Sequence, residues 1–156
     1  MKTEKSTSQL ENMLKSSGAE ELEHIVEKEV PYKAEDGRLF GEYVKGVIRE
    51  KRITQKNVFL GAGVDEKTGY KYISGEKHTN QRDIIIRLCL GAHMNLKECE
   101  RALKLYGMSP LYAKVDRDAV LIIAFNKRMY EIGEVNDILV RYGQEPLYEP
   151  HLQDGE

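Results

Sequence analysis

The sequence predicts an all-α protein, and three features support that fold class. Apolar residues recur three and four positions apart in successive segments, which places them on one side of a helix. Side chains typical of helix N-termini precede several of these segments. Gly107 and Gly143 follow two of the segments at the position of a left-handed C-cap. A chain of 156 residues can bury a core unaided, so we expect one compact unit with one appendage.

Charge and composition exclude a strong general attraction to nucleic acids or membranes. The 24 basic and 26 acidic residues give a net charge of -2, so any such attraction must be local. No apolar run approaches the ~18 residues of a membrane span, and the first residues lack the apolar stretch of a signal peptide. We therefore expect a cytoplasmic protein with no membrane partner. Cys89 and Cys99 lack metal-ligand spacing and are expected to be buried free thiols.

The first 31 residues predict two short acidic helices. Capping-box spacing occurs at residues 8–11 and 17–20, and Pro31 ends the second helix. Apolar residues at helical spacing give that second helix one apolar side, opposite a face rich in glutamate. Residues 32–38, with Asp-Gly at their centre, predict a turn or short linker before a helix that begins near Phe40.

Further helices are expected along the rest of the chain, and capping residues mark an end of several of them. Their predicted ranges are 54–61, 65–74, 83–94, 95–106, 116–130 and 134–142. The glycines of residues 61–64 permit a tight turn between the first two. The run DIIIRLCL at residues 83–90 is apolar on nearly every side, which suits the central helix of a bundle, although a strand is the competing interpretation.

An internal repeat of period 36 links the later helices. Residues 95–112 and 131–148 align without gaps and share the ending YGxxPLY, and an apolar helix is predicted before each copy. The predicted unit is a helical hairpin that occurs twice. Its glycine permits a left-handed cap, its proline prevents the helix from resuming, and its Leu-Tyr pair folds back onto the hairpin. The repeat is either a device that ends helices or a duplicated docking or dimerisation module.

These patterns divide the chain into four parts. They are an acidic N-terminal helical arm at 1–35, a central domain at 36–112, a C-terminal helical hairpin at 113–148 and a tail at 149–156. Residues 40–79 contain eight basic and five acidic side chains, a net charge of +3, whereas both flanking regions are net negative. Any electrostatic attraction to phosphates is therefore expected in the central domain.

Residues 53–79 have the sequence ITQKNVFLGAGVDEKTGYKYISGEKHT. The positions that carry a resemblance are Ile53, Thr54, Gln55, Val58, Gly63, Val64, Thr68, Tyr72, Gly75 and Lys77. At these positions the segment resembles, without a gap, the helix-turn-helix of the Cro and phage-repressor family, also called the xenobiotic-response-element family. With its flanking helices the resemblance covers about residues 40–105. It implies a lambda-repressor-like bundle, extended here by the acidic arm and the second hairpin.

The sequence departs from this family at two positions. Phe59 stands where the family has a small residue, usually alanine, and Gly69 stands where the recognition helix has a branched apolar residue. We expect the ring of Phe59 to fill the space vacated at Gly69, because volume-conserving exchanges across a contact are the ones that cores tolerate. Glycine within a helix costs about 0.5–1 kcal/mol, so the 65–74 helix is expected to be intrinsically loose.

The resemblance implies that the 65–74 helix enters the major groove of double-stranded DNA. Residues four apart face inward on this helix, which leaves a polar outer face for the groove. The candidate DNA-contacting residues are Gln55, Lys56, Lys67, Tyr70, Lys71, Ser74 and Lys77. Gln55 matches the family position that contacts the DNA backbone near a helix N-terminus. We interpret Asp65 as an N-cap rather than as a contact to cytosine.

Two functions are consistent with these features. The first is a DNA-binding transcriptional regulator, expected to be a homodimer assembled through the hairpins or the arm. The alternative is a protein–protein adaptor on a degenerate helix-turn-helix that does not bind DNA and uses the acidic arm or the C-terminal hairpin. The four histidines are scattered and the sequence lacks phosphate-loop and nucleophile motifs, so we predict no enzyme activity, catalytic residue, cofactor or metal site.

Overall fold

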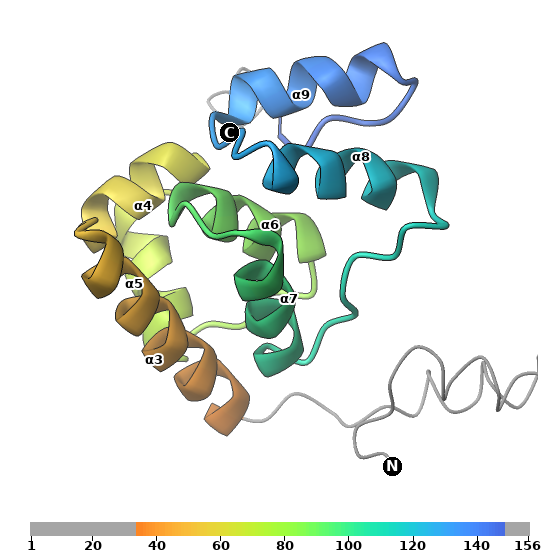
Figure 1. The fold of residues 1–156 in the computed structure, drawn as a ribbon. Helices are drawn as coiled ribbons and strands as arrows, with labels where there is room; N and C mark the ends of the chain where they lie inside the picture. Colours follow the sequence, from red (N-terminus) through yellow and green to blue (C-terminus); the bar gives the residue numbers. More distant parts are fainter. Residues whose placement is uncertain (1–33, 149–156) are drawn as a thin grey trace, which may run out of the picture. The chain divides into compact units, whose positions relative to one another are not determined.

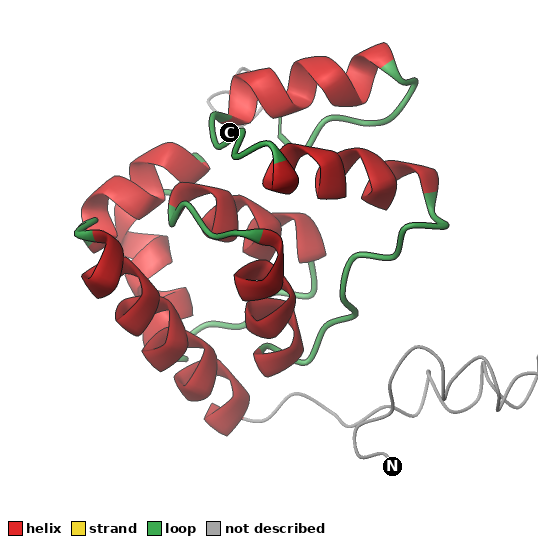
Figure 2. Ribbon diagram, in the orientation of Figure 1, coloured by secondary structure: helices red, strands yellow, loops and turns green. Residues whose placement is uncertain are grey.

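The computed structural model describes residues 34–148, and every regular element between these limits is a helix (Figure 1). The helices are α3 (Ala34–Lys51), α4 (Gln55–Ala62), α5 (Glu66–Ser74), α6 (Arg82–Gly91), α7 (Leu96–Leu105), α8 (Asp116–Asn126) and α9 (Ile132–Arg141). The all-α prediction is confirmed, and the alternative strand at residues 83–90 is wrong, because these residues lie within α6 (Figure 2). The acidic helices predicted before residue 32 and the tail at 149–156 lie outside the described residues.

Helix α6 forms the centre of the described unit. Its side chains from Ile85 to Leu90 are all buried, because α4 packs against one side and α7 against another. Gly91 lets the backbones of α4 and α6 approach closely, since a Cβ atom at this position would collide with the carbonyl of Val58. The continuous apolar pattern of this segment is therefore explained by burial on several sides.

Helix α3 covers both α5 and α7. Its predicted apolar stripe of Phe40, Val44, Val47 and Ile48 is buried. The ring of Phe40 meets the ring of Tyr106 edge-on, with centroids 4.9 Å apart. On the side facing α5, a Cβ atom at Gly41 would collide with the carbonyl of Ile73, so only glycine permits this approach.

Four of the turns between helices share one hydrogen-bond pattern. Each places a residue in the left-handed region, and these residues are Arg52, Gly63, His93 and Arg128, with φ between 57° and 68°. The next residue is apolar in every case, and its N–H donates to a carbonyl five residues earlier, at 2.9–3.1 Å. Such a motif satisfies carbonyls that a helix end would leave unpaired. It also aims the apolar side chain back toward the core.

The two copies of the repeat end their helices in the same way. Gly107 and Gly143 both have left-handed backbones, with φ of 80° and 76°. The following residues donate from N–H to the carbonyls of Leu103 and Leu139, each at 2.8 Å. Both leucines of the shared YGxxPLY ending are buried, as the sequence predicted. The repeat therefore acts as a device that ends helices.

Equivalent tyrosines of the two copies differ in exposure. The sequence predicts that the repeat tyrosines are core residues, and Tyr106 is indeed only 1% exposed. Tyr142, at the equivalent position, is 63% exposed, so that prediction is wrong for this residue. The difference arises because α3 covers Tyr106, whereas the described residues contain no such cover over Tyr142.

Several predicted boundaries are corrected. Residues 34–38, predicted as part of a turn, are helical, and Arg38 pairs with Glu42 one turn later in α3 at 3.0 Å. Helices α6 and α8 end three and four residues before the predicted 94 and 130, because each is stopped by a left-handed residue. Helix α9 begins two residues earlier than predicted. After α6 the apolar pattern continued because Ala92 and Met94 of the turn are buried, whereas Met129 and Tyr130 after α8 are only half-buried.

Two glycines within α3 provide a matched test of the packing between α3 and α5. We expect Gly41→Ala to lower the free energy of unfolding by about 1–3 kcal/mol, since the added methyl group collides with the carbonyl of Ile73. Gly46→Ala meets no atom within 4 Å and should raise it by about 0.5–1 kcal/mol. Urea unfolding measures both values. Equal effects of the two variants would contradict this account of the helix contact.

Candidate nucleic-acid interface

Helices α4 and α5 are joined by a short turn, and a side chain caps the N-terminus of each helix. The amide of Asn57 donates to Oγ1 of Thr54 at 3.1 Å, which caps α4. The amide of Thr68 donates to the carboxylate of Asp65 at 3.2 Å, which caps α5. The N-cap interpretation of Asp65 is thereby confirmed, and its carboxylate offsets one of the unpaired N–H groups at that helix end. Gly63 lies between the two caps with its left-handed backbone.

The ring of Phe59 occupies the space beside Gly69. A Cβ atom built on Gly69 would lie 2.5 Å from Cδ1 of Phe59, too close for any side chain. Phe59 is 1% exposed, and Gly69 is also buried. The expected exchange of volume between the two positions is therefore present. It means that a large ring on α4 and a bare backbone on α5 form one contact.

The outer side of this helix pair carries most of the candidate DNA-contacting residues. Lys56, Lys67, Tyr70, Ser74 and Lys77 are exposed, and Gln55 and Lys71 are half-buried. Gln55 and Lys56 stand in the first turn of α4, and the residues from Lys67 to Ser74 belong to α5. We call Lys67, Tyr70, Lys71 and Ser74 the α5 outer face. Its side chains project away from the buried Gly69, Tyr72 and Ile73.

Two of these residues make contacts of their own within the protein. The hydroxyl of Ser74 donates to the carbonyl of Lys71 at 3.2 Å and accepts from the amide of Glu76 at 3.3 Å. This side chain therefore stabilises the end of α5 and is less available to a ligand than the sequence suggested. Lys77 places its Nζ atom 5.8 Å from the centroid of the Tyr72 ring. That contact holds the lysine beside the end of the same helix.

Arg87 of α6 holds the turn between α4 and α5 through hydrogen bonds to the backbone of that turn. Its Nε atom donates to the carbonyl of Ala62 at 2.9 Å, and an Nη atom donates to the carbonyl of Gly63 at 2.7 Å. Burial lowers the pKa of this guanidinium from its ordinary value. The side chain stays charged because arginine is not deprotonated in proteins, so these acceptors are required. They fix the position from which α5 begins.

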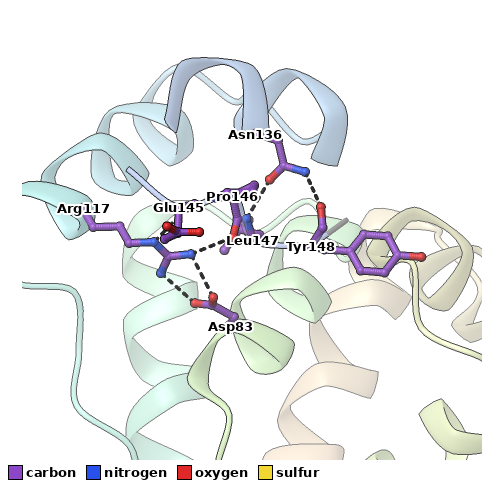
Figure 3. Close-up of polar contacts among 7 residues, drawn as sticks. All are labelled: Asp83, Arg117, Asn136, Glu145, Pro146, Leu147 and Tyr148. Carbon is purple, nitrogen blue, oxygen red and sulfur yellow. Dashed lines mark hydrogen bonds and ion pairs between the residues drawn. The ribbon is translucent and has the colours of Figure 1, made fainter. Parts of the chain in front are cut away.

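The end of the C-terminal hairpin covers the same turn. The ring of Tyr148 lies with its centroid 4.1 Å from the guanidinium carbon of Arg87. A Cβ atom on Gly63 would meet this ring at 2.7 Å. Asn136 of α9 holds Tyr148 in place through two hydrogen bonds of 2.8 Å, one to its carbonyl and one from the amide of Leu147 (Figure 3). The second hairpin is therefore in direct contact with the α4–α5 turn.

Ion pairs fasten this hairpin to α6. Arg117 binds both carboxylate oxygens of Asp83 at 2.9 and 2.8 Å, and it also donates to backbone carbonyls that precede Leu147 (Figure 3). Arg82 pairs with the buried carboxylate of Asp118 at 2.6 Å. The bidentate geometry of the Arg117–Asp83 pair fixes the orientation of both side chains. Gln81, Arg82, Asp83 and Arg117 line a hollow at this place, and each of the two arginines is paired with an aspartate.

Sequence patterns did not identify these supporting residues. Arg87 was visible only as one cation within an apolar run, and Tyr148 only as the last residue of the repeat. Both are now seen to contact the turn that positions α5. The described residues contain no cluster of side chains suited to a metal ion, and Cys89 and Cys99 are buried free thiols as predicted. Comparison with protein-family models, curated proteins and solved structures finds no match.

The contact between Phe59 and Gly69 can be tested by a double-mutant cycle. We expect Gly69→Ile to lower the free energy of unfolding by about 1–3 kcal/mol, since the new side chain collides with the ring. The same change should cost less in a Phe59→Ala background, where the space is free. Chemical denaturation of the parent, the two single variants and the double variant gives the coupling free energy between positions 59 and 69. A Gly69→Ile protein at least as stable as the parent would show that the exchange idea is wrong.

The contact between Tyr148 and the turn predicts a local effect of its removal. We expect Tyr148→Ala to speed hydrogen exchange at the amide of Val64, which donates to the carbonyl of Phe59 within the turn. Tyr142→Ala, which alters an exposed tyrosine of the same hairpin, is the control and should leave this amide unchanged. Hydrogen exchange measured by NMR compares the Val64 amide in the two variants. Equal protection of Val64 in both variants would contradict the bracing role of Tyr148.

Proposed function

We propose that this protein is a DNA-binding transcriptional regulator that inserts α5 into the major groove of double-stranded DNA. The observation that carries the proposal is the division of α5 into two sides. Gly69, Tyr72 and Ile73 are buried against the rest of the protein, whereas Lys67 and Tyr70 are exposed on the opposite side. A helix that presents one polar side beyond a short, fixed turn suits the dimensions of the major groove.

The fold we propose for α3–α7 is a lambda-repressor-like helix-turn-helix bundle. Several contacts support it: α4 and α5 meet at the left-handed Gly63, α6 packs beneath α4, and α3 lies across α5 and α7. Phe59 and Gly69 depart from the usual pattern of that family, but their contact preserves close packing between the two helices. The bundle can therefore present α5 as a rigid element despite the glycine within it.

Phosphate contacts would flank the α5 outer face. Gln55 begins α4 directly after the Thr54 cap, where free amide groups and the helix dipole favour an anion. Lys56 is exposed in the same turn, and Lys77 is exposed just beyond the end of α5. These residues belong to the segment with the positive net charge of +3. In this arrangement Lys56 and Lys77 would contact phosphates of the DNA backbone next to the inserted helix.

The regulator that we propose acts as a homodimer, because paired half-sites give a two-fold protein its orientation on DNA. The C-terminal hairpin is a candidate for the dimer contact. Val140 and Tyr142 of this hairpin are 59% and 63% exposed, so a second copy of the protein could bury them. The acidic arm at residues 1–35 is the other candidate.

These exposed side chains also favour a second function, that of a protein–protein adaptor. Exposed large apolar residues of the C-terminal hairpin and the segment before it are Val115, Ile123, Val140 and Tyr142. An adaptor would keep the helix pair α4–α5 as a scaffold and use the hairpin or the acidic arm for its partner. The near-neutral net charge of -2 is compatible with that role. We favour the regulator because the exposed cations Lys56, Lys67 and Lys77 all belong to α4, α5 and the residues just after them, and an adaptor would not need that arrangement.

Salt dependence of DNA binding tests the proposal. We expect the protein to bind random-sequence duplex DNA at low salt, with an affinity that falls steeply as the salt concentration rises, because each phosphate contact releases counterions. Lys67→Ala and Lys71→Ala should each reduce the slope of log affinity against log salt by about 1. Fluorescence anisotropy across a salt series provides these slopes.

Lys114→Ala is the matched control, since it removes the same charge from an exposed site in the connection between α7 and α8. Its slope should equal that of the parent protein. If the parent binds no duplex DNA at low salt, the regulator proposal fails and the adaptor is favoured. If all three lysine variants lose the same slope, binding is a general effect of charge and α5 is not the contacting helix.

A further inference from the structure

Tyr70 is the one aromatic side chain on the α5 outer face, and its ring is not free to move as an ordinary exposed ring would be. It is 43% exposed, yet it lies edge-on to the ring of Phe59, with centroids 4.9 Å apart and planes at 80°. This T-shaped arrangement is the favoured geometry of an aromatic pair. One side of the Tyr70 ring is therefore supported by α4 while the rest faces outward.

The supporting ring of Phe59 is itself buried and closely packed. Phe59 is 1% exposed, and its ring is packed directly against the bare backbone of Gly69, the residue that precedes Tyr70. A branched residue at position 69 would displace this ring and with it the support for Tyr70. The two departures from the repressor pattern thus have a joint consequence at position 70. They exchange a conventional core contact for an aromatic pair that reaches the surface.

The neighbours of Tyr70 on the outer face offer less discrimination between bases. The hydroxyl of Ser74 is engaged with the backbone at the end of α5. Lys67 and Lys71 carry long, mobile cations that suit phosphates as well as base edges. Tyr70 presents an apolar ring whose position is set before binding, so ordering it costs little. Sequence preference should therefore arise mainly from an apolar contact at this residue.

We propose that the ring of Tyr70, supported by Phe59, packs against the C5-methyl group of a thymine in the major groove and so selects an A·T pair. This inference rests on the proposed function, because it needs α5 to lie in the groove. The thymine methyl is the apolar group that the major groove offers, and no other base carries it. In this arrangement Tyr70 determines specificity and Phe59 is a positioning residue, whereas the lysines supply affinity that does not depend on sequence.

The test compares thymine with uracil, which pairs identically but lacks the methyl group. Duplexes with a randomised central region are enriched for binding to the full-length protein, and the selected sequence is resynthesised with deoxyuridine in place of each thymidine in turn. We expect one position in each half-site where uracil weakens binding about fourfold, the effect of removing one buried methyl group. Uracil at the other positions should leave the affinity unchanged.

Two substitutions of Tyr70 separate the ring from its hydroxyl. Tyr70→Phe keeps the ring and should retain the full difference between thymine and uracil. Tyr70→Ala removes the ring and should bind both duplexes equally, while thermal unfolding shows that it folds. Phe59→Leu keeps an apolar core residue but removes the supporting ring, and should reduce the thymine preference while leaving the salt slope unchanged. If Phe59→Leu loses the thymine preference and keeps the salt slope, the ring of Phe59 positions Tyr70. If this variant keeps the full preference, Phe59 is not a positioning residue.

The outcomes distinguish this inference from the function on which it rests. If the parent protein binds DNA with the expected salt dependence but does not distinguish uracil from thymine, the thymine contact is wrong and the regulator stands. If the selected duplexes share no thymine position, the thymine contact is likewise wrong and the regulator stands. If Tyr70→Phe abolishes the preference, the hydroxyl rather than the ring makes the contact, which also overturns the inference. If no duplex binds at low salt, both proposals fail.

Discussion

The guanidinium of Arg87 has been removed from water on the central helix α6, and the carbonyls that accept its hydrogen bonds belong to the turn between α4 and α5. Leaving such a buried charge without partners would cost several kcal/mol, so the turn must remain where the arginine can reach it. The ring of Tyr148 covers the other side of the same group. The start of α5, and with it the position of its outer face, depends on this arrangement.

The contact between Phe59 and Gly69 shows how two unfavourable local choices can be compatible with a defined structure. A glycine within α5 weakens the helix, and a phenylalanine on α4 is too large for an ordinary approach of two helices. Together they close the interface, because the ring lies where a side chain at position 69 would be. The same ring then supports Tyr70 at the surface. Core packing and the composition of the candidate interface are thus physically coupled.

The repeated hairpin illustrates how context changes the role of one motif. Both copies end their helices with a left-handed glycine and bury the following leucine. The first copy packs beneath α3, which covers Tyr106, whereas the equivalent Tyr142 of the second copy is largely exposed. The final tyrosine of the second copy instead reaches the α4–α5 turn. The same motif therefore makes different contacts in its two copies.

The sequence by itself determined the helical class, most helix positions, the caps at Thr54 and Asp65 and the polar side of α5, because spacing and caps are local properties that each segment carries alone. The starts of α6, α8 and α9 have no side-chain cap. It also indicated the exchange between Phe59 and Gly69. Only the tertiary structure decided that residues 34–38 extend α3, that Ser74 serves the end of α5, and that Arg87 and Tyr148 hold the turn. Arg87 and Tyr148 depend on partners 24 or more residues away, and Ser74 on competition for hydrogen bonds at the end of α5, and periodicity contains no information about either.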